Sequence, residues 1–440
     1  MNDANKIESI YNSTVKSTVV LIVLLFVSTI YLYGNTQGKP RPRVIITTDG
    51  EVDDQSSFVR FLLYTNDFDV EGIVATNSKW QRNGHGTQWI LNSIDLYNKV
   101  RPNLLLHSSD YPTSEYLKSK VVLGDQDILN LEKYPPYKDT PGSDLILKQL
   151  LNDDTRDLHI ACWGGVNTVA QSLWKLKNNY SKAIYQKAIK KVRIYAIDFQ
   201  DNGGSWIVSC IQDAIIIKSA CWYRTFGYRP QDKNPHVEFM SENWLDNNIK
   251  TNHGELGASY PQNYISEGDS PSFFNLIDNG LCAYEDYTLG GWGGRFINTS
   301  YNYYVDASEN GNIKTPFTRW IVDIQNDFEA RMDWCVKSYT EANHQPIIKT
   351  VNVSKAIVKA GDRVVLETSV FDSDNDEIIY KWTCYNKECD AELKIKNDTT
   401  SKASFIVPEN TNGVIQILLE ISDNGSPILK TYKRILIRIE

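Results

Sequence analysis

The chain has 440 residues, of which 41% are hydrophobic and 23% are charged, and its formal net charge is −8. A chain of this length exceeds what one ordinary hydrophobic core accommodates, so we expect a globular protein of at least two domains. The balance is acidic and no basic stripe is present, so the composition excludes nucleic acid as the expected partner.

The first 34 residues carry an apolar segment. Residues Val19–Tyr33 are almost continuously apolar, Lys6 and Lys16 precede them, and the polar linker “NTQGKPRPR” follows. This length is near the upper limit of a signal peptide core and short of the roughly twenty residues that span a bilayer. We therefore expect export to the periplasm, the medium or the outer face of a membrane, with residues 1–34 acting as a cleaved signal peptide or as an uncleaved anchor.

Strand-like and helical patterns alternate after the linker. Strands are predicted at Arg43–Asp49, Phe68–Ser78, Pro102–Ser108, Asp157–Gly165 and Lys191–Gly204. Helices are predicted at Asp54–Thr65, Thr87–Val100 and Val166–Asn178. Apolar strands separated by helices are typical of a layered α/β domain built on a mainly parallel sheet.

Polar loops follow several of these strands. In open α/β sheets ligands bind beside the carboxyl ends of the strands. The loops “TTDGEVDD”, “ATNSKW”, “CWGG” and “DFQDNGG” all occupy such positions. We therefore expect Asp49, Asn77, Trp163 and Asp201 to line one rim.

Four acidic residues crowd the first of these loops. Asp49, Glu51, Asp53 and Asp54 fall within six positions, and carboxylates this close repel one another unless a cation lies among them. Helix N-capping accounts for one or two of them. The ligand pattern of an EF-hand is missing. An oxygen-rich site for a hard cation such as Ca²⁺ is the favoured interpretation, with capping as the alternative.

Four motifs, in order, carry a resemblance to a known family. The loop “TTDGEVDD” resembles the D-x-D-x-G-x-D-D signature of inosine/uridine-type nucleoside hydrolases, with Thr47 in place of the first Asp. The later stretches “RIYAIDFQDNGGSWI”, “YISEGDSPSFFNLI” and “GGWGGRF” closely resemble exported nucleoside hydrolase-like proteins, some of them labelled cellulose-binding. These stretches cover most of residues 40–340, so the resemblance implies a nucleoside hydrolase-type domain at residues 35–342.

The resemblance also implies roles for individual residues. Asp49 would bind Ca²⁺ and act as the base toward water, and Asp54 would chelate the ion. Asp53 would hold a sugar hydroxyl. The backbone carbonyl of Trp163 and the carboxylate of Asp269 would complete the metal shell.

The implied reaction is hydrolysis of an N-glycosyl or related glycosidic bond. A metal-activated water would give its proton to Asp49 and attack an anomeric carbon with oxocarbenium character. The acid that protonates the leaving group is unassigned, because Gly268 stands where a His usually precedes the last Asp. His85 and His253 are candidates by residue type only. We expect substrate contacts from Asp53, Asn77, Asp201, Asn202, Trp206, Glu267 and Trp292.

The pattern changes after about residue 340. Short alternating strands with turn signals predict an all-β sandwich at residues 343–440, which resembles immunoglobulin- or cadherin-like modules. Its loop Asp372–Asp376, “DSDND”, resembles a calcium loop but lacks Gly at the sixth position and an acidic residue at the twelfth, where Thr383 stands. A solvated turn is therefore expected there. A fragment of residues 35–342 is expected to fold and bind metal without this module.

Two functions remain open from the sequence. One is a calcium-dependent hydrolase, supported by the retained aspartates. The other is a non-catalytic protein that binds a cellulose-like glycan on a hydrolase fold. Gly268 and the aromatic loops around Trp206 and Trp292 support it. The glycines in these loops are equally well explained by tight turns. The expected partner is a small sugar, a nucleoside or a glycan. The sequence does not indicate an oligomeric state.

Overall fold

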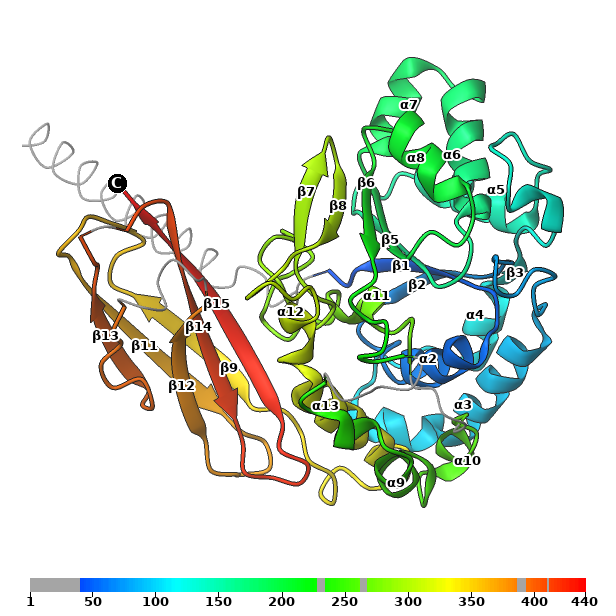
Figure 1. Cartoon of the computed structure of the whole chain (residues 1–440). Helices are drawn as coiled ribbons and strands as arrows, with labels where there is room; N and C mark the ends of the chain where they lie inside the picture. Colours follow the sequence, from blue (N-terminus) through cyan, green and yellow to red (C-terminus); the bar gives the residue numbers. More distant parts are fainter. Residues whose placement is uncertain (1–39, 228–233, 262–266, 386–392, 410) are drawn as a thin grey trace, which may run out of the picture. The chain divides into compact units, whose positions relative to one another are not determined.

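The computed structural model describes residues 40–227, 234–261, 267–385, 393–409 and 411–440 (Figure 1). The predicted signal or anchor segment lies outside these residues. Residues 42–440 form one compact unit. None of the helices in the described ranges is long and apolar enough to cross a membrane.

An eight-stranded sheet organises the first part of the unit. Its strand order is β3-β2-β1-β4-β5-β6-β8-β7, and every neighbouring pair is parallel except β7 with β8. The strands are β1 Arg43–Thr48, β2 Asp69–Ala75, β3 Val121–Leu123, β4 Leu158–Cys162, β5 Val192–Ile197, β6 Ile215–Ser219, β7 Phe296–Ser300 and β8 Tyr303–Asp306. This confirms the predicted mainly parallel α/β architecture.

Helices cover both faces of this sheet. The helices are α2 Val52–Leu63, α3 Gln88–His107, α4 Ser114–Ser119, α5 Pro141–Leu151, α6 Asn167–Asn179, α7 Lys182–Ile189, α8 Gly203–Cys210, α9 Glu242–Leu245, α10 Gly254–Ala258, α11 Pro271–Phe274, α12 Thr315–Thr318 and α13 Ile321–Asp333. Alternate residues of β1 enter different cores: Val44 and Ile46 pack with residues of α2, α3 and α13, whereas Ile45 packs with residues of α5, α6 and α7. Because both faces are buried, β1 is apolar at consecutive positions.

One predicted strand is wrong. Residues 102–107 form the last turns of α3, with Pro102 inside the helix. The buried face of α3 runs through Ile90, Ile94, Tyr97, Val100 and Leu104 at helical spacing, so it continues past the proline. Continuous packing of this face outweighs the backbone hydrogen bond that Pro102 cannot donate.

The C-terminal module consists of two sheets in which every neighbouring pair is antiparallel except β10 with β15. Their orders are β10-β15-β14-β12 and β13-β11-β9. The strands are β9 Ile347–Val353, β10 Ile357–Val358, β11 Arg363–Phe371, β12 Ile379–Cys384, β13 Lys402–Ile406, β14 Val414–Ser422 and β15 Lys430–Ile439. Leu366, Trp382, Phe405 and Ile417 come from both sheets and share one buried core, as the predicted sandwich requires.

Side chains of β15 also enter the α/β part. Tyr432 belongs to the same buried cluster as Trp292 and Trp320, and its hydroxyl donates to Asp323 Oδ2 at 2.6 Å. Arg434 donates to the backbone oxygens of Leu281 at 2.9 Å and Gly290 at 2.6 Å. The β module therefore shares its packing with the rest of the unit.

Candidate metal and active site

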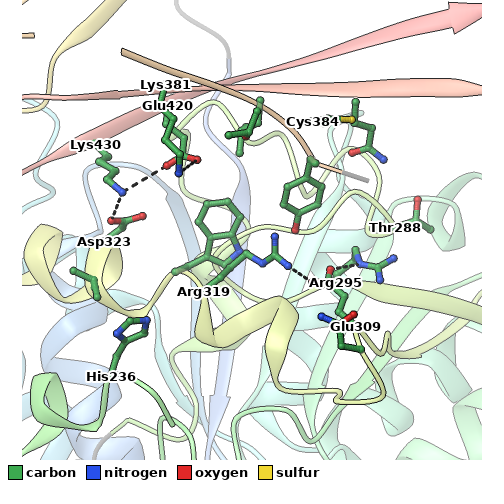
Figure 2. A pocket seen from close by; sticks show the side chains of 17 residues that line it. His236, Thr288, Arg295, Glu309, Arg319, Asp323, Lys381, Cys384, Glu420 and Lys430 are labelled. Atoms are coloured by element: carbon green, nitrogen blue, oxygen red, sulfur yellow. Dashed lines mark hydrogen bonds and ion pairs between the residues drawn. The ribbon is translucent and has the colours of Figure 1, made fainter. Parts of the chain in front are cut away.

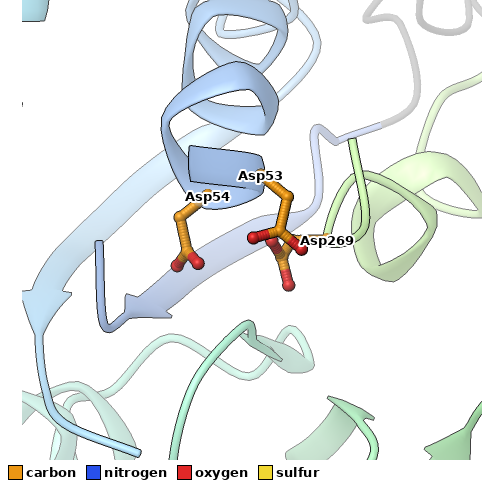
Figure 3. Close-up of side chains that lie close together, drawn as sticks. All are labelled: Asp53, Asp54 and Asp269. Carbon is orange, nitrogen blue, oxygen red and sulfur yellow. The ribbon is translucent and has the colours of Figure 1, made fainter. Parts of the chain in front are cut away.

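An aspartate cluster lies at the carboxyl end of β1. Asp49 follows the strand, and Asp53 and Asp54 stand in the first turn of α2. Asp269, just before α11, joins them from far along the chain. One carboxylate oxygen each of Asp53, Asp54 and Asp269 lies within 4.8 Å of the others (Figure 3). All four residues are buried, with exposed fractions of 1% to 4%.

Several oxygens of this cluster have no hydrogen-bond partner. They are both carboxylate oxygens of Asp49, Oδ1 of Asp53 and Oδ2 of Asp269. Asp54 differs, because its Oδ1 accepts from the hydroxyl of Thr48 and from the backbone N–H of Asp49. Within the described ranges, none of the four forms an ion pair with Lys, Arg or His. Buried carboxylates are costly without compensation, so the cluster requires protons or a cation.

The pKa values of the cluster reflect this environment. Burial, and then the neighbouring carboxylates, raise the pKa of Asp53 to about 8 and that of Asp54 to about 7. The same two causes hold the pKa values of Asp49 and Asp269 well above their usual range. A divalent cation would remove both the repulsion and the need for protons. The donor set, all oxygen, fits Ca²⁺.

The predicted backbone ligand lies beside this cluster. Gly164 follows Trp163, and a Cβ at Gly164 would stand 2.8 Å from Asp49 Cβ. The carbonyl oxygen of Trp163 already accepts a hydrogen bond from Gln200 Nε2 at 2.6 Å. A carbonyl oxygen has a second lone pair, so this contact leaves it able to ligate.

The loops after β2, β4 and β5 meet at the same edge of the sheet. Their polar side chains form hydrogen bonds to other parts of these loops. Asn77 accepts from Asn167 Nδ2 at 2.9 Å and donates to the oxygen of Arg82 at 3.0 Å. Asp201 accepts from the backbone N–H groups of Asn167 and Gly203, both at 2.7 Å, at the starts of α6 and α8. Asn202 is the N-cap residue of α8. Their substrate contacts stay predictions.

The remaining predicted substrate residues pack inside the fold to different degrees. Glu267 is 1% exposed and forms an ion pair with Arg60. Trp292 is also 1% exposed and packs edge-on against Tyr432. Trp206, on α8, is partly buried against the hydrophobic core that also contains residues of α5, α6 and α7. Of these three residues, only Trp206 keeps surface that a ligand could contact.

The loop after β2 adds residues that the sequence singled out weakly or not at all. A Cβ at Gly50, next to Asp49, would stand 2.5 Å from His85 Cβ and 2.9 Å from Trp89 Nε1. His85 is exposed, and Trp80 in the same loop is 65% exposed. His253, by contrast, pairs with Asp333 at 3.2 Å. In the sequence, the one indication that this loop belongs to the site was that “ATNSKW” follows a predicted strand.

A separate cavity of about 1000 Å³ is lined by residues of the α/β part and of β12, β14 and β15 (Figure 2). Its charges are paired: Glu309 binds Arg295 at 3.0 Å and also Arg319, and Asp323 binds Lys430 at 2.9 Å. None of the clustered aspartates lines it. The cavity is therefore distinct from the candidate metal site.

Comparisons with known proteins agree with the fold. Residues 43–296 match a family described as “Cellulose-binding Sde182, nucleoside hydrolase-like domain”, and residues 363–439 match “Cellulose-binding protein Sde0182, C-terminal domain”. No curated protein matches the chain.

Two solved structures resemble this chain to very different extents. A nucleoside hydrolase-related hypothetical protein from Saccharophagus degradans, described as associated with carbohydrate metabolism, is 34% identical with a TM-score of 0.79. That match covers 91% of this chain and 100% of the other. A plant nucleoside hydrolase, PpNRh1, is 11% identical with a TM-score of 0.33, covering 64% of this chain and 99% of the other.

Proposed function

We propose that this chain, which belongs to the cellulose-binding Sde182 family with a nucleoside hydrolase-like domain, is an exported, calcium-dependent hydrolase of N-glycosyl or related glycosidic bonds. One observation carries the proposal. Asp53, Asp54 and Asp269 bring carboxylate oxygens together at the start of α2, and buried oxygens of Asp49, Asp53 and Asp269 have no hydrogen-bond partner among the described residues. Such oxygens are explained by a bound cation and are unexplained by helix capping.

Asp49, Asp54, Asp269 and the carbonyl of Trp163 would hold the cation. When bound, Ca²⁺ supplies charge that ionises the carboxylates and makes a neighbouring water more acidic. Asp49 has two oxygens without a hydrogen-bond partner, and its carboxylate would accept a proton from the attacking water. Asp53 Oδ1 is free to accept a hydrogen bond from a sugar hydroxyl, which orients the anomeric carbon.

Departure of the leaving group requires a different residue from the usual one. Gly268 stands where nucleoside hydrolases have a His before the last Asp, and a Cβ there would stand 2.4 Å from Asp53 Oδ2, so a side chain at this position would require Asp53 to move. His85 lies beside Gly50 and is exposed, which makes it the candidate donor to a leaving group.

A non-catalytic glycan-binding function is the second candidate. The glycine at position 268 and the burial of all four aspartates favour it. The family description, which names cellulose binding, also favours it.

The two functions are separated by assaying the purified chain with and without Ca²⁺. Inosine, uridine and p-nitrophenyl β-D-ribofuranoside probe hydrolysis, and cellopentaose probes binding. Calcium-dependent cleavage that Asp49→Asn abolishes supports the hydrolase. Cellopentaose binding without cleavage of any probe assigns the chain to the second function. Cleavage that is unchanged in Asp49→Asn contradicts the proposed mechanism.

Export is proposed from the apolar segment Val19–Tyr33. Cell fractionation with N-terminal sequencing should find the chain outside the cytoplasm, either beginning near Gly34–Arg43 or retained on a membrane. A soluble cytoplasmic protein that retains Met1 would contradict this.

A further inference from the structure

We propose a second Ca²⁺ site, formed by Asp372, Asp374 and Asp376 in the loop between β11 and β12 of the C-terminal module. The site is separate from the cluster at the start of α2, and it does not depend on hydrolase activity. It replaces the solvated turn that the sequence predicts for this loop.

The loop brings three carboxylates together. One oxygen from each of Asp372, Asp374 and Asp376 lies within 4.8 Å of the others. Oδ1 of Asp372 accepts from the backbone N–H groups of Asp374 at 2.9 Å and Asp376 at 3.1 Å. These bonds fold the loop around Asp372, and Oδ2 is the oxygen that Asp372 has left for a ligand.

That oxygen is the observation that points to a cation. Oδ2 of Asp372 is buried and has no hydrogen-bond partner, and the residue is only 8% exposed. A turn that acts only through capping needs Oδ1 alone and gains nothing by burying a second, unpartnered oxygen. A cation within the cluster would pair with Oδ2 and compensate its lost hydration.

A fourth carboxylate increases the negative charge. Asp423, in the loop between β14 and β15, is fully buried and accepts from the backbone N–H of Leu429 at 2.9 Å. A Cβ at Gly425 would stand 2.6 Å from Asp376 Oδ2, so this second loop lies directly against the cluster. The imidazole Nδ1 of His344 lies 3.1 Å from Asp374 Oδ2, and among the residues that the structure describes no Lys or Arg forms an ion pair with any of these four aspartates.

The chemistry of the cluster selects Ca²⁺. All the donors are carboxylate oxygens, and Ca²⁺ accepts such ligands in irregular geometry. The Gly and the twelfth-position acid of an EF-hand are unnecessary here, because the second loop supplies shape and charge from another part of the module.

The site also lies against the segment that precedes β9. The backbone N–H of His344 donates to Asp374 Oδ2 at 2.7 Å, and Asn343 Nδ2 donates to Asp423 Oδ2 at 3.1 Å. A bound ion would therefore hold the residues that connect α13 to the β module, and its removal would loosen them.

Calorimetric Ca²⁺ titration of the full chain, after removal of metal, tests the proposal. Asp376→Asn is the main variant, because the Asp376 carboxylate accepts no hydrogen bond among the described residues and Asn keeps its shape. Asp372→Asn is the second variant, since its amide oxygen still accepts the two backbone N–H groups. Asp362→Asn, in the same module and paired with Lys355 at 2.6 Å, is the matched control.

We expect Asp376→Asn and Asp372→Asn each to lose one Ca²⁺ equivalent, or to weaken one site at least tenfold, and Asp362→Asn to titrate like the parent. Asp54→Asn should remove a different equivalent, so the failure of either site is recognised separately. A parent chain that binds no Ca²⁺, or binding that is unchanged in both Asp376→Asn and Asp372→Asn, would overturn the proposal.

Discussion

The guanidinium of Arg60 and the carboxylate of Glu267 form a buried ion pair, with side chains 0% and 1% exposed. Arg60 Nη2 donates to Glu267 Oε1 at 3.0 Å, and Glu267 also accepts from Tyr260 and Ser270. Arg60 stands on α2, which carries Asp53 and Asp54, whereas Glu267 stands two residues before Asp269. This pair therefore holds the two halves of the aspartate cluster together.

Breaking this pair should destabilise the fold strongly. Arg60→Met and Glu267→Gln are each expected to lower the free energy of unfolding by about 3–5 kcal/mol, because each leaves an uncompensated buried charge. Urea denaturation measures the change. The control is Lys355→Met, whose solvent-exposed pair with Asp362 should contribute much less to stability, because water and salt screen exposed ion pairs. Equal, small effects in all three variants would contradict the structural role given to Glu267.

Removing single carboxylates should separate metal binding from capping. Asp49→Asn and Asp54→Asn are expected to weaken Ca²⁺ binding at the cluster at least tenfold, about 1.4 kcal/mol, because an amide offers no negative charge. Asp53→Asn should raise the KM for the substrate and should weaken Ca²⁺ binding less than the other two substitutions. Calorimetry measures the affinities.

The matched control for these variants is Asp201→Asn, which alters a carboxylate at the same sheet edge that caps α6 and α8. It should change the melting temperature without changing Ca²⁺ affinity. If Asp49→Asn and Asp54→Asn behave in the same way as this control, the aspartates are caps and the metal site is absent.

Stability should depend on pH and Ca²⁺ together. In the metal-free protein the pKa values of Asp53 and Asp54 are raised by burial to about 8 and about 7, whereas an unfolded Asp titrates near about 4. The folded state therefore holds protons that the unfolded state has lost, and this contribution to stability falls as pH rises from about 4 to about 8. Ca²⁺ replaces those protons, so it should raise the melting temperature more at pH 8 than at pH 5.

Thermal unfolding at the two pH values, with and without Ca²⁺, measures this difference. The Asp376→Asn background isolates the cluster at α2 from the site proposed in the β module. The double variant Asp53→Asn/Asp54→Asn should lose the difference between pH 8 and pH 5. An equal Ca²⁺ effect at both pH values in the Asp376→Asn background would contradict the raised pKa values.

Cutting the chain before the β module should leave the metal cluster intact but weaken the fold. A fragment of residues 42–342 keeps all four aspartates, yet it uncovers Trp292 and Trp320 and removes Tyr432 from their cluster. We expect a soluble fragment with unchanged Ca²⁺ affinity at the cluster and a lower melting temperature. Arg434→Met in the full chain should lower the melting temperature by a smaller amount. A fragment that melts like the full chain would show that the shared packing contributes little.

The sequence by itself determined the α/β architecture and part of the site. Apolar runs bounded by polar loops are local patterns that predict buried strands. The sheet buries β1 and β4 on both faces, so these two strands form where the pattern predicts them. Asp49, Asp53 and Asp54 are neighbours in sequence, so their repulsion was visible without a fold. The helical path through Pro102 was missed, because the packing that outweighs the proline comes from other elements.

Only the tertiary structure decided which distant groups meet. Arg60 and Glu267 are separated by 207 positions, and no periodicity in the sequence records that contact. The same holds for Gly268 against Asp53, and for the loop of Asp423 and Gly425 against Asp376. Burial and the lack of a partner, which turn a carboxylate into a candidate metal ligand, depend on everything packed around it. A linear pattern contains the residue types, whereas these contacts depend on the folded chain.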